Sequence, residues 1–469
     1  MRRIWSVAAC FTTVMGAVGA CSSDDTTSAG GTDGGAANDA PSAADTSPGV
    51  DGGGPSDANA GDGGDASEAG DAGHPVTGYT VLGEISYAFV KPYSLAVDSQ
   101  DALYVSQQTD AEDTHTIYLT TRDYSVDNNP GQARILKFDS AGTYVGWIGA
   151  GNDNTYGLHA TNSTATAVYS FGMGAFNMIR GMTFDPATGH LFVLDDWRVQ
   201  ELDNNNNFVT THFTGYAPGG FGWQVGGGTA TYAGPGIGGF QFPSCIRVHK
   251  GKLWIGNWYW NYSGWPNGGY NAVDVLDMTT GLGAGWLGGA FNSGTAQTTH
   301  GFFAASSPDG GSAAFYDDGG TTLTPQSSYL HSSSPGIFSS PRHFVWQNDK
   351  IYVVDDTSDP VLSVFDENGV MQPGKLEHLV GADEKPFAIA LDKYGNIIIS
   401  DMYTGSVRFF TQKLDANGEF TQAAEWQVDT PSVENISYPR IADFAWDSQD
   451  NLYVAATTKN KVYKIKLTY

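Results

Sequence analysis

The sequence predicts an all-β fold, a six-bladed β-propeller, and the prediction depends on three observations. Six short segments resemble one another, each is followed by a partner rich in β-branched and aromatic residues, and a third such set follows the second. Short β-prone runs separated by turn residues are typical of strands, and repeated four-strand units are typical of propeller blades. No segment keeps a 3.6-residue apolar period, so we expect little helix.

The expected strands come in the same order in every unit. Innermost strands are expected at SLAVD (94–98), GMTFD (181–185), CIRVH (245–249), HFVWQ (343–347), AIALD (388–392) and DFAWD (443–447). Second strands are expected at 102–107, 190–195, 252–257, 350–355, 396–401 and 451–456, and third strands at 134–139, 198–203, 272–277, 361–366, 406–411 and 461–466. Fourth strands follow in five units, for example TYVGWIG (143–149) and LEHLVG (376–381).

The sixth unit lacks a fourth strand of its own. It stops after its third strand at Tyr469, and a lone strand, YTVLGEI (79–85), precedes the first unit. An unpaired outer edge exposes a row of backbone hydrogen-bonding groups. We therefore predict that residues 79–85 form the outer strand of the last blade and close a ring of six.

Within residues 79–469 the units resemble NHL repeats. A proline, a short spacer, an apolar run ending in Asp, then "YVxD" and "xIxxFD" recur, most clearly in the units that start at Pro341 and Pro386. The pattern is weaker where Ile179 replaces the proline and where Gln107 and Ala456 replace the second aspartate. NHL-like propellers include adhesion modules, RNA-binding domains, lyases and lactonases, so the resemblance implies the fold and leaves the function open.

The N-terminus has the features of an export signal. Residues 1–20 carry two arginines and then a short apolar stretch, which is too short for a membrane-spanning helix. This stretch ends in Val18-Gly19-Ala20-Cys21, which resembles a bacterial lipobox. The resemblance implies a lipoprotein anchored in the membrane through acylated Cys21, with ordinary secretion as the alternative. Because Ser rather than Asp follows Cys21, the resemblance favours the outer membrane of a bacterial cell envelope over its inner membrane.

Residues 21–75 have the composition of a disordered acidic tether. Eleven of the 50 acidic residues and none of the 23 basic residues lie in 22–75, a segment rich in Gly, Ala, Ser and Thr. Such a segment cannot bury enough apolar surface to fold, which leaves 76–469 as the propeller. The chain's net charge of −27 disfavours nucleic acid as a partner. Of the three cysteines, only Cys245 lies in the predicted propeller, so that domain cannot form an internal disulfide.

Long insertions are expected on one face of the propeller. They occupy 108–133, 150–180, 214–244, 258–271 and 290–342, and long ordered loops on a rigid scaffold often carry binding sites. Aromatic rings and glycines concentrate in two of them and suit stacking on a glycan, peptide or protein ligand. The residues of this predicted ligand site are Trp223, Trp258, Trp260 and Trp265. The alternative is that these rings pack the insertions onto the scaffold.

A second group of candidates lies where the innermost strands begin. Arg180, Arg342 and His343 are expected there as ligand-binding residues, and together with Asp443 they are the candidate catalytic set of an alternative lyase or hydrolase. A competing interpretation pairs the arginines with the residues that end the second strands, which are Asp195, Asn257, Asp355 and Asp401. No HxH or HExxH motif occurs, so the sequence indicates no metal site or cofactor, although a divalent ion in the central funnel stays open as an alternative. The absence of such a motif favours a binding or scaffold module over the enzyme.

Replacing Cys21 with Ser removes the predicted lipid acceptor. We expect the variant to incorporate no fatty-acid analogue and to move from the membrane fraction to the soluble fraction, because fewer acyl chains anchor a protein far more weakly. Metabolic labelling and fractionation of both proteins measure this. Unchanged labelling of the Cys21→Ser variant would rule out the lipoprotein interpretation.

Overall fold

The computed structural model places Ala66–Tyr469 in one compact unit. It describes residues 74–107, 133–167, 174–176, 178–195, 198–214, 224–225, 242–258, 271–279, 283–292, 297–304, 315–316, 322–325, 338, 340–355, 362–374, 376, 385–429 and 439–469.

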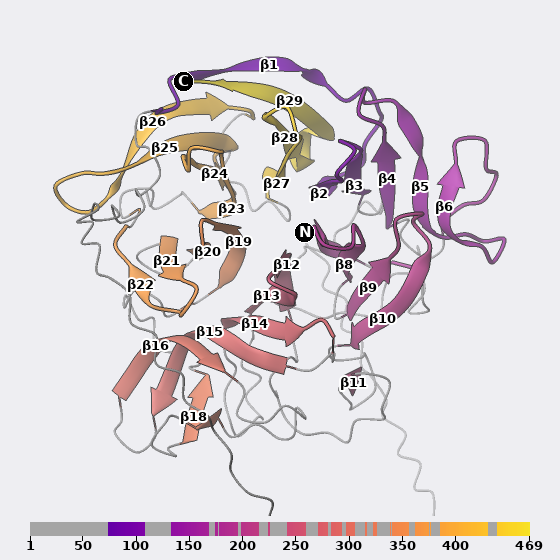
Figure 1. Cartoon of the computed structure of the whole chain (residues 1–469). Helices are drawn as coiled ribbons and strands as arrows, with labels where there is room; N and C mark the ends of the chain where they lie inside the picture. Colours follow the sequence, from indigo (N-terminus) through magenta and orange to yellow (C-terminus); the bar gives the residue numbers. More distant parts are fainter. Residues whose placement is uncertain are drawn as a thin grey trace, which may run out of the picture. The chain divides into compact units, whose positions relative to one another are not determined.

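Six antiparallel sheets form the blades of a propeller, and each innermost strand packs against the innermost strands of the two adjacent blades (Figure 1). The innermost strands of blades 1 to 6 are β2 (Pro92–Val97), β7 (Ile179–Phe184), β12 (Phe242–His249), β19 (Pro341–Gln347), β23 (Pro386–Leu391) and β27 (Ile441–Trp446). The second strands are β3 (Leu103–Gln107), β8 (Leu191–Asp195), β13 (Lys252–Trp258), β20 (Lys350–Asp355), β24 (Ile397–Asp401) and β28 (Asn451–Ala456). The third strands are β4 (Arg134–Phe138), β9 (Arg198–Leu202), β14 (Ala272–Asp277), β21 (Leu362–Asp366), β25 (Ser406–Leu414) and β29 (Lys461–Thr468). The fourth strands are β5 (Tyr144–Ala150), β10 (Phe208–Thr214), β15 (Gly283–Asn292), β22 (Met371–Gln372), β26 (Phe420–Gln427) and β1 (Gly78–Glu84).

The core lies between neighbouring sheets. The second strands β20 and β24 are almost continuously buried, as expected for strands covered on both faces. Blades 3 and 4, for example, share one apolar cluster that includes Val273, Phe344 and Val353. Helix is scarce, as predicted. The described residues contain one 3₁₀ turn, Thr457–Lys459, and no helix among them is long and apolar enough to cross a membrane.

Aspartates close many of the hairpin turns. In seven turns the same carboxylate oxygen accepts the backbone N–H groups two and four residues later, which holds the tight turn between two strands. These residues are Asp98, Asp139, Asp203, Asp366, Asp392, Asp415 and Asp447. Part of the chain's acidic character is therefore a requirement of its turns.

The predicted closure is confirmed. Strand β1 pairs antiparallel with β29, with Tyr79 opposite Leu467, and completes the last blade. At the seam between blades 6 and 1, the Thr457 hydroxyl donates to the Pro92 carbonyl at 2.7 Å. Backbone pairing also extends before the predicted strand, because the Thr77 N–H donates to the Thr468 carbonyl at 2.7 Å.

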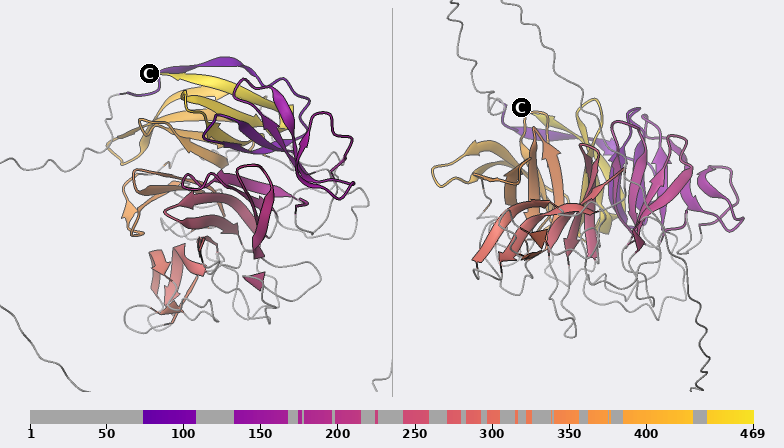
Figure 2. Two further views of the ribbon diagram at one scale, coloured as in Figure 1. Left: turned by 45° about the vertical axis from the view of Figure 1, so that its right-hand side comes forward. Right: turned by 60° about the horizontal axis from the view of Figure 1, so that its bottom comes forward.

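The outer strands add detail to the expected blades. The fourth strand of blade 4 is Met371–Gln372, because the tight turn closed by Asp366 brings the chain back at once, and of the expected strand 376–381 only Leu376 lies within the described residues. Parts of the insertions extend the sheets (Figure 2). These extra strands are β6 (Tyr156–Ala160), β11 (Gln224–Val225), β16 (Gln297–Ala304), β17 (Phe315–Tyr316) and β18 (Thr322–Pro325).

The closing segment should stabilise the propeller through Val76. Val76 is 1% exposed in the core shared by blades 5 and 6, whereas Val81 on β1 is 44% exposed. We expect Val76→Ala to lower the free energy of unfolding by about 2 kcal/mol and Val81→Ala to change it by less than about 0.5 kcal/mol. Chemical denaturation measures both.

Truncations give a second measure of closure. A chain without residues 1–73 should match the full chain in stability, and one without residues 1–85 should lose several of the roughly 5–15 kcal/mol of a typical domain. Equal melting temperatures of the two truncated chains would contradict closure by β1.

Candidate functional site

A bulge recurs at the start of all six innermost strands. Each strand's pairing with its second strand shifts register there, between Pro341 and His343 in blade 4 and at the equivalent place in the other five blades. Bulges re-aim side chains and often lie next to functional sites. The first residues of the six repeated segments lie within this shift or directly after it, which places them at equivalent positions at one level of the propeller axis: Ser94, Gly181, Cys245, His343, Ala388 and Asp443.

Serine hydroxyls satisfy backbone groups that the bulges displace. The Ser94 N–H donates to Ser106 Oγ at 2.7 Å, and the Ala388 N–H donates to Ser400 Oγ at 2.9 Å. Ser400 Oγ in turn donates to the Ile441 carbonyl of the next blade at 3.0 Å. In blade 3 the position equivalent to Ser106 and Ser400 is Gly256, which has no hydroxyl to make such a bond. Neighbouring blades are therefore hydrogen-bonded at the level of the site, which makes the site rigid.

Gly256 leaves room for a hydroxyl from the innermost strand. A Cβ at this position would lie only 2.6 Å from Ser244 Oγ. That hydroxyl donates to the Pro341 carbonyl of blade 4 at 2.6 Å. Blade 3 therefore makes the bond to its neighbour from its innermost strand, where blade 5 uses its second strand.

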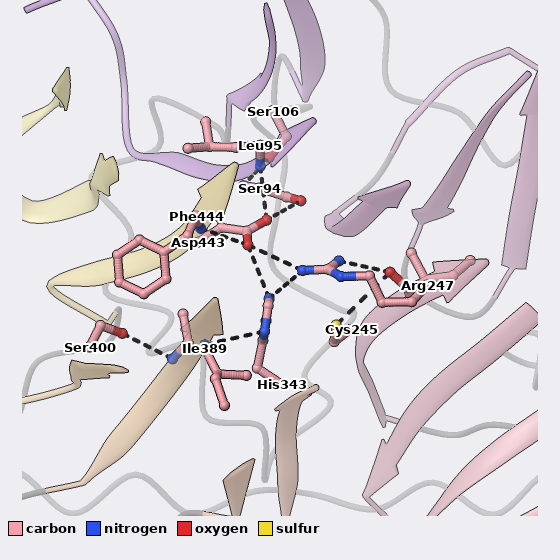
Figure 3. A network of polar contacts seen from close by, with 12 residues as sticks. Ser94, Leu95, Ser106, Cys245, Arg247, His343, Ile389, Ser400, Asp443 and Phe444 are labelled. Atoms are coloured by element: carbon pink, nitrogen blue, oxygen red, sulfur yellow. Dashed lines mark hydrogen bonds and ion pairs between the residues drawn. The ribbon is translucent and has the colours of Figure 1, made fainter. Parts of the chain in front are cut away.

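Four polar side chains from four blades meet at the axis: Ser94, Arg247, His343 and Asp443 (Figure 3). We call these four residues and Cys245 the axial cluster. His343 Nε2 lies 3.0 Å from Asp443 Oδ1. Arg247 Nη2 lies 2.9 Å from the same ring nitrogen and 3.6 Å from Asp443 Oδ1. Two predicted residues, His343 and Asp443, are thus in direct contact.

Asp443 is held as a carboxylate. Its Oδ2 accepts from the Ser94 hydroxyl at 2.8 Å and from the Leu95 N–H at 2.9 Å, and Oδ1 accepts from its neighbour, the Phe444 N–H, at 2.8 Å. Burial alone would raise the pKa of Asp443, but the hydrogen bond and charge of His343 and the charge of Arg247 lower it below its ordinary value. The axis therefore holds a buried negative charge with cationic partners.

The backbone selects the tautomer of His343. Its Nδ1 accepts the Ile389 N–H at 3.3 Å, so in the neutral ring the proton is on Nε2, from which it can be donated to Asp443. Burial tends to lower the pKa of His343, while Cys245 and the hydrogen bond to Asp443 raise it, and the net direction is upward. Both ring nitrogens therefore have partners, Nδ1 in the Ile389 N–H and Nε2 in Asp443 and Arg247.

Cys245 is the residue of the cluster that the sequence analysis did not single out. Its thiol is free and 1% exposed, and it donates a long hydrogen bond to the Ile246 carbonyl at 4.0 Å. Burial tends to raise its pKa, but Arg247 and His343 lower it, and the net direction is downward. Arg247 was also missed. The repeats could have identified Cys245, because the segment CIRVH places it at the position that His343 and Asp443 occupy in their own units.

The residues just before this level form a second group, which we call the entry layer: Tyr93, Arg180, Ser244, Arg342, Phe387 and Ala442. Arg180 and Arg342 are 8% and 9% exposed. Burial raises the pKa of Tyr93, and the charges of both arginines oppose this rise. Arg180 Nε is buried without a hydrogen-bond partner in the part of the chain that the structure describes.

The polar residues that end the second strands have structural partners. The carboxylates of Asp195, Asp355 and Asp401 accept the N–H of the residue that precedes the innermost strand of their own blade, at 2.9, 2.9 and 2.7 Å. Asp401 also closes the turn that follows it. Asn257 instead donates to Asp274 at 2.9 Å. Asp195 also pairs with Arg198 of its own blade at 2.8 Å. These contacts hold each second-strand residue to its own blade and do not test the predicted pairing with Arg180 and Arg342.

The predicted aromatic platform is not covered by the structure. Trp223, Trp260 and Trp265 lie outside the described residues, and of Trp258 only the backbone, at the end of β13, is described. Among the described residues, no group of three His, Cys, Asp or Glu side chains is arranged to hold a metal ion.

Comparisons with known proteins add little. No family model and no curated protein matches the chain. Among solved structures, it is similar to the WD40 β-propeller domain of Doa1 (12% identity, TM-score 0.41, 83% of this chain and 97% of that chain) and to streptogramin B lyase (11%, 0.37, 83% and 98%). It is also similar to a gluconolactonase from Xanthomonas campestris (11%, 0.41, 84% and 96%). Likenesses at this level carry no argument about function.

Asp443 should be the most sensitive residue of the cluster. We expect Asp443→Asn to lower the free energy of unfolding by about 3–5 kcal/mol, because it leaves the buried Arg247 and His343 without their counter-charge. Asp450→Asn is the matched control. It removes a half-exposed ion pair with Lys393 and should cost about 0–1 kcal/mol. Denaturant unfolding measures both, and equal effects would contradict the buried network.

Proposed function

We propose that this chain is a lipid-anchored, extracytoplasmic propeller that binds a small anionic ligand at the entry layer. The observation that carries the proposal is the charge of the innermost strands. Across all six they contain three arginines, Arg180, Arg247 and Arg342, and a single acidic residue, Asp443. The whole chain, in contrast, has a net charge of −27. A concentration of buried cations in so acidic a protein favours an anionic ligand.

The chemistry of the two entry-layer arginines suits a carboxylate. A guanidinium is planar and always charged, and it can donate two parallel hydrogen bonds to a carboxylate. Arg180 has a buried Nε–H without a partner among the described residues, and such a donor costs free energy until it is bonded. Tyr93, whose pKa is affected by the charges of both arginines, offers a further hydroxyl donor. A carboxylate between Arg180 and Arg342 would bind all three groups.

The insertions would form the walls of the same site. Trp258 ends β13, at the same end of the blade as the start of β12, and Trp223, Trp260 and Trp265 lie in the neighbouring insertions. Aromatic planes beside a carboxylate-binding pair would suit an acidic glycan or the C-terminal end of a peptide. The proposed lipid anchor at Cys21 and the acidic segment 21–75 would display this site in the bacterial envelope, at the outer membrane.

Arg180→Ala should weaken anion binding without unfolding the protein. Losing a hydrogen-bonded charge typically costs about 1.5–3 kcal/mol, which is about 10- to 150-fold in affinity. Titration calorimetry of the full chain with acetate, succinate and D-glucuronate, in chloride-free buffer, measures the affinity, with neutral glucose as the reference.

Arg408→Ala is the matched control. Arg408 is also largely buried, but it lies on the third strand of blade 5, beside Glu425. Its replacement should leave the affinity for the anions unchanged. The proposal is wrong if none of the anions binds, or if the two arginine variants weaken binding equally.

A further inference from the structure

His343 has more hydrogen-bonding neighbours than one neutral imidazole can satisfy. Its two ring nitrogens face one acceptor, Asp443 Oδ1 at 3.0 Å, and two donors, the Ile389 N–H at 3.3 Å and Arg247 Nη2 at 2.9 Å. The carboxylate and the guanidinium share the same nitrogen, Nε2, and Figure 3 shows the resulting triangle of contacts. A neutral ring has one N–H and one lone pair, so at least one of the three neighbours stays unsatisfied.

Arg247 is the neighbour that a neutral ring leaves without a hydrogen bond. With the proton on Nε2, the ring donates to Asp443 and accepts from Ile389, so Arg247 Nη2 lies beside an N–H. Arg247 is retained there by the Ile246 carbonyl, which accepts from Nη1 at 2.8 Å, and by the charge of Asp443 at 3.6 Å. Its side chain is 18% exposed, and those of His343 and Asp443 are 6% and 4% exposed, so the guanidinium is the least confined of the three groups.

Protonation of His343 changes the charge at the axis. With a neutral ring, the charges of Arg247 and Asp443 cancel, whereas an imidazolium leaves one positive charge in excess. Two cationic groups then lie 2.9 Å apart, and like charges repel strongly at such a distance in a buried site. Protonation also removes the lone pair that accepts the Ile389 N–H. The protonated cluster therefore needs a further negative charge close by.

The entry layer lies close enough to be affected by this charge. In blades 2 and 4, Arg180 and Arg342 directly precede the axial level, and one strand residue spans about 3.3 Å. Burial raises the pKa of Tyr93, the charges of Arg180 and Arg342 lower it, and the charge of Asp443 raises it. Tyr93 is therefore within electrostatic reach of both the two arginines and the axial carboxylate.

We propose that protonation of His343 strengthens anion binding at the entry layer. The inference rests on the proposed binding function and adds its regulation. An anion held by Arg180 and Arg342 favours the imidazolium, and by linkage the imidazolium favours the anion by the same factor. The affinity is therefore high at low pH, and it falls as the pH rises through the pKa of His343. The net direction of that pKa is upward, which places the transition above the ordinary value of 6.5.

The other groups around the ring do not account for such a transition. On β12 and β19, Arg247 and Arg342 keep their charge, since a guanidinium stays protonated in proteins. On β27, the charges of His343 and Arg247 hold the pKa of Asp443 below its ordinary value against the effect of burial. Strand β23 contributes a backbone N–H, and β20 places Val354 opposite the ring. The thiol of Cys245 on β12 can titrate, so it requires a variant of its own.

Titration calorimetry of the full chain with D-glucuronate, from about pH 5.5 to 8.5, tests the coupling, because the carboxylate of this anion stays ionised over that range. The dissociation constant of the wild-type chain should rise about tenfold across the range. Binding near the midpoint should take up a fraction of a proton, which buffers of different ionisation enthalpy reveal. His343→Gln should bind equally well at every pH, because a neutral amide does not take up the proton.

His190→Gln is the matched control. His190 also contacts a carboxylate, that of Glu201, but it directly precedes β8, at the end of blade 2 opposite the entry layer. This variant should keep the full pH dependence. Cys245→Ser should keep it too, because the thiol donates to the Ile246 carbonyl and not to the ring. If His343→Gln does not fold, proton uptake by the wild-type chain decides, and its absence would contradict the coupling.

Two results would overturn the inference. In the first, the wild-type chain binds D-glucuronate with the same affinity at every pH. In the second, His343→Gln keeps the pH dependence of the wild-type chain. In both cases the anion site itself stands, because binding is still observed. If D-glucuronate does not bind at any pH, the proposed binding function fails, and its regulation fails with it.

Discussion

One buried carboxylate connects four of the six blades. Asp443 of blade 6 accepts from Ser94 and Leu95 of blade 1, contacts His343 of blade 4, and is 3.6 Å from Arg247 of blade 3. The innermost strands are otherwise held together by apolar packing between sheets and by single bonds between neighbouring blades, such as Ser400 to the Ile441 carbonyl and Ser244 to the Pro341 carbonyl. Asp443 is the group that joins blades that are not neighbours, and the position of the imidazole depends on it.

Charge is distributed unevenly along the innermost strands. Aspartates at their ends, Asp98, Asp392 and Asp447, bind backbone N–H groups in tight turns, whereas Arg180 and Arg342 lie at their starts. The seven turn aspartates thus place part of the negative charge of the domain at one end of the blades. The proposed anion site lies at the opposite end, where the insertions begin. The net charge disfavours nucleic acid as a partner, but it does not predict the sign of the site.

The sequence predicted the propeller, its six units and its closure, because strand repeats and a missing strand are local signals. Other features depend on distances between blades and could not be found in one unit. The short strand of blade 4, Met371 and Gln372, was not predicted, because two residues after a tight turn give almost no pattern. Arg180, Arg342, His343 and Asp443 were found from their place at the strand starts. Cys245 was dismissed because it has no disulfide partner, although its column in the repeat alignment also holds His343 and Asp443.

The six blades differ in the residue that they have at this level of the axis. Blades 2 and 5 have Gly181 and Ala388 where the others have Cys245, His343 and Asp443, and their innermost strands carry the same bulge. The fold therefore does not require polar side chains at this position. Burying charges costs several kcal/mol per ion even when they are paired, and apolar replacements of similar volume are often as stable or more stable. A propeller selected only for stability would have small or apolar residues in all six blades. The contacts among an imidazole, a guanidinium and a carboxylate at this level therefore cost stability that the fold itself does not require.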